Sequence, residues 1–165
     1  MGKTVIILGS SRSDGDTATV IQNLKALSGF DSIDLRAYNI SYYDYEHHNS
    51  TDDFIPLMRN IIAQYDTIIF ATPIYWYTMS GILKVFFDRI SDLLTIEKDL
   101  GRRLRGKGFA VLSCSFNSEV SEPFWHPFRS TAEYLGMNYL AQTHINDLHD
   151  KAALQRFMVD LQETK

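Results

Sequence analysis

Short apolar runs that are typical of buried strands alternate with segments of helical period, and this alternation constrains the fold more than any other feature. The β-branched run at 3–9 is continuous, as in a strand covered on both faces, and similar runs lie at 66–72 and 109–115. We expect further strands at 32–38 and 137–145 and helices at 17–29, from Asp52 or Asp53 to about Ala63, 80–94, 123–136 and 151–162. This pattern predicts an α/β fold, in which right-handed βαβ units form an open five-stranded parallel sheet with helices on both faces.

The composition fits an ordinary globular protein. The 165 residues suit a single domain over 1–165, and 45% hydrophobic residues with a net charge of -4 favour neither a nucleic-acid nor an acidic-membrane partner. No stretch approaches the roughly 20 apolar residues of a membrane span, and the amino terminus lacks the features of a signal peptide. Cys114 is the single cysteine, which excludes an internal disulfide and a cysteine-built cluster. We expect a soluble cytoplasmic protein.

The predicted architecture indicates where a ligand would bind. In open parallel sheets, ligands bind at the carboxyl ends of the strands, near the point where the strand order reverses. The segments that follow the first, third and fourth expected strands are 9–17, 72–81 and 113–122. We name them the first, second and third loops.

The first loop, "GSSRSDGDT", leads directly into a helix. Free backbone N–H groups and the positive end of the helix dipole favour an anion there. Hydroxyl donors are added by Ser10, Ser11, Ser13 and Thr17, and Arg12 can hold two phosphate oxygens. The loop matches neither the dinucleotide nor the Walker fingerprint. A phosphate site and an ordinary capped helix start both remain open from these residues alone.

The second loop carries three consecutive aromatics, Tyr75–Tyr77, after Pro73. We expect a turn beginning at Pro73 to lift the rings out of the sheet, where they can face a flat heteroaromatic ligand. The backbone amides of Ile74 to Trp76 would hydrogen-bond the edge of that ligand. A packing cluster against a neighbouring helix or subunit is the alternative.

The third loop, "SCSFNSE", combines small hydroxyl residues with Phe116 and Asn117. Cys114 falls at the end of the expected strand, where a lone cysteine is more often a small buried hydrophobe than a nucleophile.

In this order and spacing, the first two loops resemble a known family. "GSSRSDGDTAT" is similar to the phosphate loop G-S-x-R-x-x-G-N-T of the NADPH-dependent FMN reductases, and "ATPIYWYTMSGILKVFFDR" resembles the family's second loop. The resemblance extends from Val5 to about Asp92 and continues more loosely beyond. It implies a flavodoxin-like fold with strand order 2-1-3-4-5, bound FMN, and NADPH or NADH as co-substrate.

The resemblance also implies roles for individual residues. The phosphate would be held by Ser10, Arg12, Ser13 and Thr17, with the backbone of Asp16 and Ala18 nearby. Pro73, Ile74, Tyr75 and Trp76 would line the isoalloxazine ring, and its other side would be bordered by Ser113, Cys114, Ser115 and Asn117. Tyr77 and Met79 would face the next helix or a subunit, while Lys84, Asp88 and Arg89 would orient that helix.

Two departures from related sequences matter. Asp16 stands where the family often has Asn, and a carboxylate beside a phosphate is unfavourable unless it points away, for instance to cap its own helix. The iron–sulfur flavoproteins related to this family carry a cysteine cluster after the second strand, where this chain has "NISYYDYEHHNS". That branch is excluded.

The function implied is an NAD(P)H-dependent oxidoreductase that passes electrons through FMN to a small acceptor, which could be a flavin, a quinone, an azo or nitro compound, or a metal ion. One alternative is a flavodoxin-type carrier without a nicotinamide site, which the modest net charge of -4 disfavours. A second is a flavin-free regulatory or interaction protein that kept the fold, which the Ser10–Arg12–Thr17 loop disfavours and Asp16 leaves open. The resemblance further implies a homodimer or homotetramer.

Two charged segments have open roles. The basic stretch 101–108 could recognise the 2′-phosphate of NADPH, although a solvated connection is the simpler interpretation. His47 and His48, in the aromatic segment 39–50, could bind a metal with Asp44 and Glu46, but a lid or subunit contact is a better use of this segment.

Overall fold

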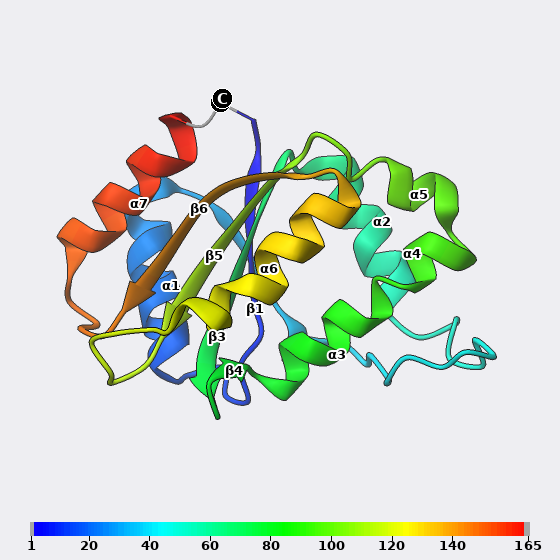
Figure 1. The fold of residues 1–165 in the computed structure, drawn as a ribbon, viewed down its shortest axis with the longest axis horizontal. Helices are drawn as coiled ribbons and strands as arrows, with labels where there is room; N and C mark the ends of the chain where they lie inside the picture. Colours follow the sequence, from blue (N-terminus) through cyan, green and yellow to red (C-terminus); the bar gives the residue numbers. More distant parts are fainter. Residues whose placement is uncertain (1, 164–165) are drawn as a thin grey trace.

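The computed structural model describes residues 2–163 (Figure 1). Five parallel strands form the sheet in the order β2-β1-β3-β5-β6. A short sixth strand, β4, pairs antiparallel with the end of β3. Their bounds are β1 Thr4–Leu8, β2 Asp31–Asp34, β3 Thr67–Tyr75, β4 Thr78–Met79, β5 Gly108–Cys114 and β6 Asn138–Ile145.

This topology confirms the predicted flavodoxin-like α/β sheet. Numbered by the five parallel strands alone, the order is the expected 2-1-3-4-5. The strand β4 was not expected, and it arises because β3 continues past the sheet edge and folds back on itself.

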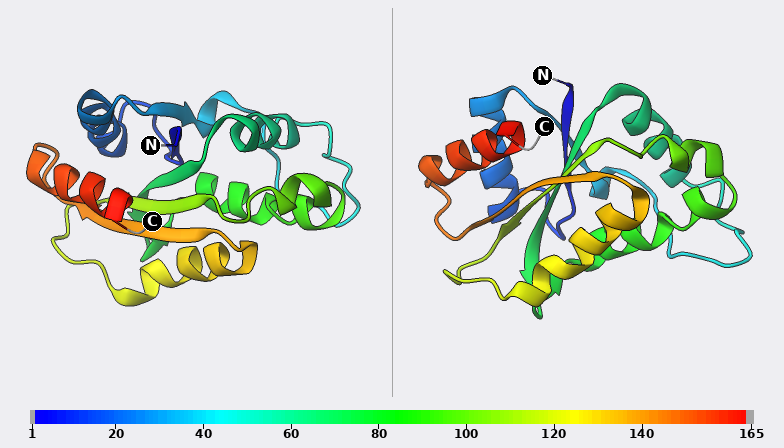
Figure 2. Two further views of the ribbon diagram at one scale, coloured as in Figure 1. Left: turned by 90° about the horizontal axis from the view of Figure 1, so that it is seen from above. Right: turned by 45° about the horizontal axis from the view of Figure 1, so that its top comes forward.

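Helices cover both faces of the sheet (Figure 2). Side chains alternate between faces along each strand, so Val5 and Ile7 join one apolar cluster while Ile6 and Leu8 join the other. Helices α1 (Asp16–Ser28) and α7 (Lys151–Glu163) pack on the Ile6 face. Helices α2 (Phe54–Gln64), α3 (Gly81–Arg89) and α6 (Glu122–Leu135) pack on the other.

Two predicted elements differ from the structure. The expected strand 32–38 is shorter, because the Asp34 carboxylate accepts a 2.9 Å hydrogen bond from the Arg36 backbone N–H and begins the 3₁₀ turn η1 (Leu35–Ala37). The expected helix 80–94 ends at Arg89, and the chain continues in the short helices α4 (Asp92–Thr95) and α5 (Lys98–Arg102). The predicted basic loop 101–108 therefore begins inside α5.

The predicted helix ends at glycine are confirmed. Gly29 and Gly136 follow α1 and α6 with φ of 71° and 68°, in the left-handed region that favours glycine. Within residues 2–163, the structure contains no helix with the length and apolar character needed to cross a membrane.

Candidate cofactor site

The three loops meet at the carboxyl edge of the sheet, at the lower side of Figure 1. The first and second loops are joined where the Gly9 N–H donates to the Ala71 carbonyl at 2.9 Å. The second and third loops start level with each other, because Pro73 is the register partner of Cys114. The strand order places β1, β3 and β5 side by side, so the predicted convergence of these loops is present in the fold.

The amino terminus of α1 presents unpaired backbone donors. Gly15 is its N-cap residue and offers no side-chain acceptor, and the first helical hydrogen bond runs from Thr19 N–H to the Gly15 carbonyl at 3.0 Å. Within residues 2–163, the N–H groups of Asp16, Thr17 and Ala18 have no hydrogen-bond partner. Three free donors at a positive helix end suit a phosphate, whose oxygens accept only.

Some side chains of the first loop make contacts within the loop, and others are exposed to solvent. Ser10 is buried, and its hydroxyl accepts a 3.3 Å hydrogen bond from the Arg12 backbone N–H, so it also shapes the loop. Arg12 lies against Gly15, where an added Cβ would stand 3.2 Å from its Nε atom. Ser13 is exposed and Thr17 is buried at the helix start. Arg12 and the free N–H groups of α1 are therefore next to each other.

Asp16 does not cap its helix. It is the first residue of α1 and is half-buried, with no side-chain hydrogen bond to the helix start. Its carboxylate lies close enough to Cys114 to act on that thiol. Burial, reinforced by Asp16, raises the pKa of Cys114 to about 11 against the lowering effect of a hydrogen bond with Thr17. The Cys114 side chain packs in the apolar cluster beneath α1, so only its backbone remains at the edge of the sheet.

The second loop is a tight hairpin rather than a turn that begins at Pro73. Strand β3 runs through Pro73 to Tyr75, and the pairs Ile74–Met79 and Tyr75–Thr78 leave Trp76 and Tyr77 as a two-residue loop. Both loop residues have positive φ, 48° for Trp76 and 66° for Tyr77. Such loops favour Asn-Gly because bulky residues are strained in this region. The tip is therefore held in an unfavourable conformation by the ladder below it.

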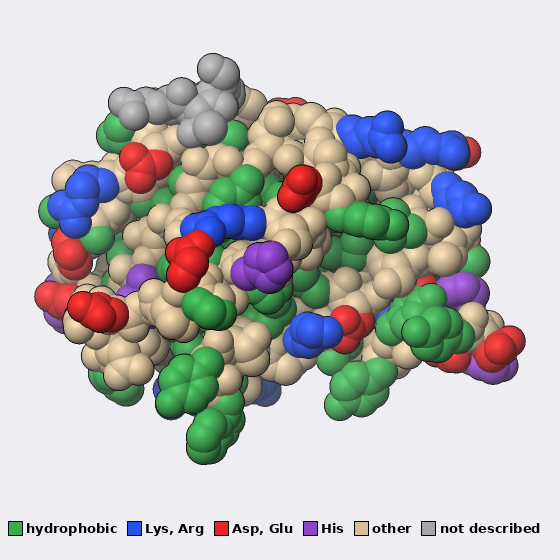
Figure 3. All heavy atoms as spheres, in the orientation of Figure 1, with side chains coloured by type: hydrophobic (Ala, Val, Ile, Leu, Met, Phe, Trp, Pro, Cys, Tyr) green, Lys and Arg blue, Asp and Glu red, His purple; other side chains and the backbone are tan. Residues whose placement is uncertain are grey.

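The hairpin tip projects from the molecule. Trp76 is 92% exposed and Tyr77 79% exposed, and Phe116 of the third loop is 87% exposed. Hydrophobic side chains stand out along this edge in Figure 3. A cavity of about 290 Å³ lies between the hairpin and the third loop, with Ile74, Tyr77 and Asn117 in its wall. Met79 is buried against the α3 side of the core, as expected, whereas Tyr77 lines this cavity.

Ser80 connects the first two loops. Its hydroxyl donates to the Gly9 carbonyl at 2.7 Å and accepts from the Leu83 N–H at 3.2 Å, which caps α3. Its backbone N–H donates to the Thr72 hydroxyl at 3.0 Å. Gly9 is required at this contact, because an added Cβ would stand 2.6 Å from Leu83 Cβ. Ser80 of the sequence motif thus fixes the loops relative to each other.

The third loop is held by a histidine that the sequence did not single out. His144 of β6 is the register partner of Ser113, and its Nδ1 lies 2.8 Å from the Ser113 hydroxyl. Its Nε2 lies 2.8 Å from the Asn117 carbonyl and 3.3 Å from the Ser115 hydroxyl. A carbonyl can only accept, so Nε2 carries the proton and Nδ1 accepts from Ser113. Burial lowers the pKa of His144 below its ordinary value despite the Asn117 carbonyl.

The predicted third-loop residues are therefore brought together by His144. Ser113 is fully buried, Ser115 is half-buried and Asn117 is exposed. The only signal is that His144, the seventh residue of β6, is the register partner of Ser113, and strand register is not visible in a sequence.

The basic stretch lies away from this site. Arg102 ends α5, and the chain then enters β5 at Gly108, at the amino end of the strand. The carboxyl ends of the strands form the opposite edge. Arg103, Arg105 and Lys107 are thus at the opposite edge of the sheet from the three loops.

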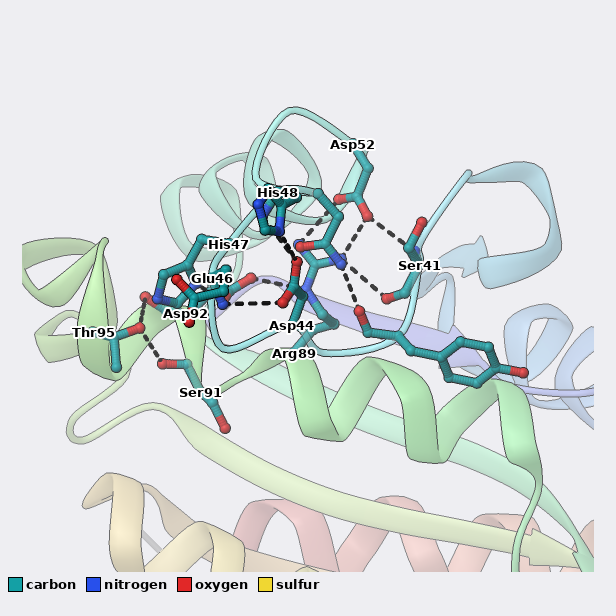
Figure 4. Close-up of polar contacts among 12 residues, drawn as sticks. Ser41, Asp44, Glu46, His47, His48, Asp52, Arg89, Ser91, Asp92 and Thr95 are labelled. Carbon is teal, nitrogen blue, oxygen red and sulfur yellow. Dashed lines mark hydrogen bonds and ion pairs between the residues drawn. The ribbon is translucent and has the colours of Figure 1, made fainter.

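The segment 41–53 is anchored by a buried arginine (Figure 4). The Arg89 side chain is fully buried and donates to the carboxylates of Asp52 and Asp92, to the latter at 2.8 Å, and to the Ser41 carbonyl at 3.1 Å. His47 Nδ1 lies 3.2 Å from Asp92. Arg89 therefore orients the end of α3, as expected, and also holds a segment 37 residues away in the chain.

The paired histidines face different carboxylates. His47 contacts Asp92, while His48 Nδ1 lies 2.8 Å from the Asp44 carboxylate (Figure 4). Across the described residues 2–163, no group of three or more His, Cys, Asp and Glu side chains is arranged to hold a metal ion. The two histidines act in separate contacts.

Comparison with known proteins assigns the family. The model of the family described as NADPH-dependent FMN reductase matches residues 3–147. The chain belongs to this family. A relative in Bacillus subtilis (strain 168), "Putative NAD(P)H-dependent FMN-containing oxidoreductase YwqN", is 39% identical over 149 residues, which cover 83% of this chain and 81% of the relative.

Solved structures show the same fold. The flavoenzyme NAD(P)H:(acceptor) oxidoreductase FerB from Paracoccus denitrificans aligns with a TM-score of 0.74 at 14% identity, covering 99% of this chain and 97% of FerB. General stress protein 14 from Treponema denticola, solved in complex with FMN, aligns with a TM-score of 0.56 at 19% identity, covering 98% of this chain and 95% of that protein.

The residues at the edge fit the cofactor of the NADPH-dependent FMN reductases. The unpaired N–H groups of Asp16 to Ala18 and the guanidinium of Arg12 supply donors for a phosphate. The cavity between the hairpin and the third loop has aromatic side chains in its wall and can accommodate a flat ring.

Proposed function

We propose that this protein oxidises NAD(P)H and passes the electrons through bound FMN to a small-molecule acceptor. The observation that carries the proposal is the set of three unpaired N–H groups at the start of α1, in a chain of the NADPH-dependent FMN reductase family. These donors match a phosphate monoester and lie on the same sheet edge as the aromatic hairpin.

Under this proposal the protein binds and orients the cofactor. Arg12 and the N–H groups of Asp16, Thr17 and Ala18 hold the phosphate, with Ser10, Ser13 and Thr17 around it. Pro73 to Trp76 line one side of the ring, and Ser113, Ser115, Asn117 and the backbone of Cys114 border the other. When bound, FMN supplies the hydride chemistry. The chain's own contribution is the fixed geometry that Ser80 and His144 give to the loops.

The acceptor is a small molecule that reaches an open edge. We propose a free flavin, a quinone, an azo or nitro compound, or a metal ion. We further propose a homodimer or homotetramer, because exposed aromatics gather at the hairpin and in the 39–50 segment, where Tyr42 and Tyr45 are 80% and 84% exposed. Light scattering of the purified protein measures this assembly.

A visible spectrum tests the function. Purified protein, or protein mixed with FMN, is expected to show flavin absorbance that bleaches when NADPH or NADH is added without oxygen. Flavin bands that fail to bleach with either nucleotide would contradict the reductase and indicate an electron carrier. A colourless protein that cannot be reconstituted with FMN would exclude both functions.

Replacing Arg12 tests the phosphate site. Arg12→Ala removes a charge-assisted contact, so the dissociation constant of FMN is expected to rise roughly 10- to 100-fold. Fluorescence quenching of FMN on binding measures it. Arg103→Ala, at the opposite edge of the sheet, is the matched control and is expected to bind FMN as the wild type does.

A further inference from the structure

A second, larger groove adjoins the first loop on the side that faces β2. Its volume is about 590 Å³, within the range of small-molecule sites. It is lined by Ser11 from the first loop, by the turn after β2 and the segment that follows, and by one face of α3. The residues that matter here are Ser11, Arg36, Tyr38, Tyr42, Ile82 and Val85. We name it the Arg36 groove.

Arg36 places a free positive charge in this groove. Its guanidinium donates one hydrogen bond to the Ser11 carbonyl, and no ion pair of Arg36 occurs within residues 2–163. A guanidinium has five N–H donors, so most of them remain available to a ligand. The side chain is exposed, as expected for a group that receives an anion from solution.

Arg36 and Arg12 contact different residues of the first loop. Arg12 lies against Gly15 and the start of α1, where the FMN phosphate is proposed to bind. Arg36 contacts Ser11 and faces the groove beside α3. The two guanidinium groups therefore lie beside different surfaces, one at the start of α1 and one in the groove.

The walls of the groove suit a flat base. Tyr38 and Tyr42 contribute aromatic surface, and Ile82 and Val85 contribute aliphatic surface from α3. An adenosine carrying a phosphate on its ribose combines a flat ring with an anion, and so matches both features. The basic stretch 102–107 lies at the opposite edge of the sheet, so its side chains are far from this groove.

We propose that the Arg36 groove binds the adenosine end of NADPH and that Arg36 recognises its 2′-phosphate. The inference rests on the proposed function, since it assigns a site to the co-substrate of that reaction. It makes Arg36 the residue that selects NADPH over NADH, because NADH lacks the 2′-phosphate. A guanidinium is the side chain that best matches phosphate geometry.

Direct binding tests the site without any turnover. Adenosine 2′,5′-bisphosphate is titrated calorimetrically into FMN-loaded wild type, Arg36→Gln and Arg103→Gln, the last a control at the opposite edge. Arg36→Gln is expected to weaken binding roughly 10- to 100-fold while Arg103→Gln leaves it unchanged. Absence of binding to the wild type, or equal binding to the wild type and Arg36→Gln, would overturn the proposal.

Steady-state kinetics separate the recognition of phosphate from general effects. Arg36→Gln is expected to raise KM for NADPH roughly 10- to 100-fold with kcat and KM for NADH nearly unchanged. Arg36→Lys keeps the charge and is expected to recover part of the loss. Equal changes with both nucleotides, or a weaker FMN affinity in Arg36→Gln, would place Arg36 in the flavin site and overturn the assignment.

The two proposals fail in different ways. If neither nucleotide reduces the flavin but adenosine 2′,5′-bisphosphate still binds in an Arg36-dependent manner, the reductase function falls and the groove stands. If both nucleotides reduce the flavin and Arg36→Gln is indistinguishable from the wild type, the groove assignment falls and the function stands.

Discussion

His144 shows how one side chain can shape a cofactor loop. Its ring accepts a hydrogen bond from the hydroxyl of Ser113, its register partner, and donates one to the Asn117 carbonyl. The two bonds hold the ends of the segment 113–117 together. Ser115 lies in the same cluster. The histidine makes these contacts as the neutral tautomer, and burial favours that form.

The free energy of unfolding is therefore expected to fall as the pH drops below about 6.5. The pKa of His144 is lowered in the folded protein, so its stabilising contribution is present above the unfolded pKa and is lost as the pH falls through the folded value. Urea unfolding at pH values from 7.5 to 5 measures the effect. His144→Gln keeps an uncharged hydrogen-bonding side chain, and a pH profile as steep as that of the wild type would contradict this role.

The Cys114 thiol is expected to be inert in the folded protein. Its pKa of about 11 leaves little thiolate at pH 8, and the side chain is only 3% exposed beneath α1. Iodoacetamide labelling followed by mass spectrometry should detect modification only after urea is added. Rapid labelling of the folded protein would show that the side chain reaches the surface.

At the scale of elements, the β3–β4 hairpin combines strain with exposure. Two bulky residues, Trp76 and Tyr77, adopt positive φ at its tip. Only two residue pairs, Ile74–Met79 and Tyr75–Thr78, form the ladder beneath them. Such conformations cost on the order of 1–3 kcal/mol each. We propose that the side chains at this tip contribute to ligand binding, which the positive φ values, the exposure and the adjacent cavity support.

Replacing the tip by Asn-Gly tests this interpretation. The double variant Trp76→Asn, Tyr77→Gly suits a type I′ turn, so the midpoint of thermal unfolding is expected to rise by a few degrees. The affinity for FMN or the rate of flavin reduction by NAD(P)H is expected to fall, because the aromatic side chains of Trp76 and Tyr77 are lost. An unchanged flavin site with a stabilised hairpin would show that the tip serves another contact.

At the scale of the whole molecule, Arg89 joins α3, α4 and the segment that walls the Arg36 groove. The guanidinium is fully buried between Asp52 and Asp92, whose side chains are 6% and 1% exposed. Burial alone would raise the pKa of Asp52, but hydrogen bonds from Arg89 and from the backbone of Ser41 and Phe54 outweigh it and lower that pKa. The cluster is held together by charge, with the Phe54 ring 5.0 Å from the guanidinium carbon.

Arg89→Met is expected to destabilise the protein by about 3–5 kcal/mol, because it leaves two buried carboxylates without their partner. Urea unfolding measures the change. Lys84→Gln is the matched control, since Lys84 and Asp88 form an exposed pair on the same helix, and such pairs contribute about 0–1 kcal/mol. Similar losses in both variants would contradict a special role for Arg89.

The same cluster predicts acid sensitivity. Because the pKa of Asp52 is lowered below its ordinary 3.8, the stability it contributes is present above that pH and is lost as the pH falls further. Arg89→Met removes a cause of that lowering, so its loss of stability between about pH 4 and pH 2 should be smaller than that of the wild type.

Local patterns in the sequence determined the order of strands and helices, the helix ends at Gly29 and Gly136, and the sheet edge where the loops meet. Hydrophobic period and glycine conformation act over a few residues, so these features are readable without a structure. The His144 contacts, the Arg36 groove and the Arg89 cluster depend instead on the tertiary structure. Their partners lie far apart in the chain, 25 residues for Arg36–Ser11, 31 for Ser113–His144 and 37 for Asp52–Arg89. Such contacts form only once strand register and helix packing bring the two segments together.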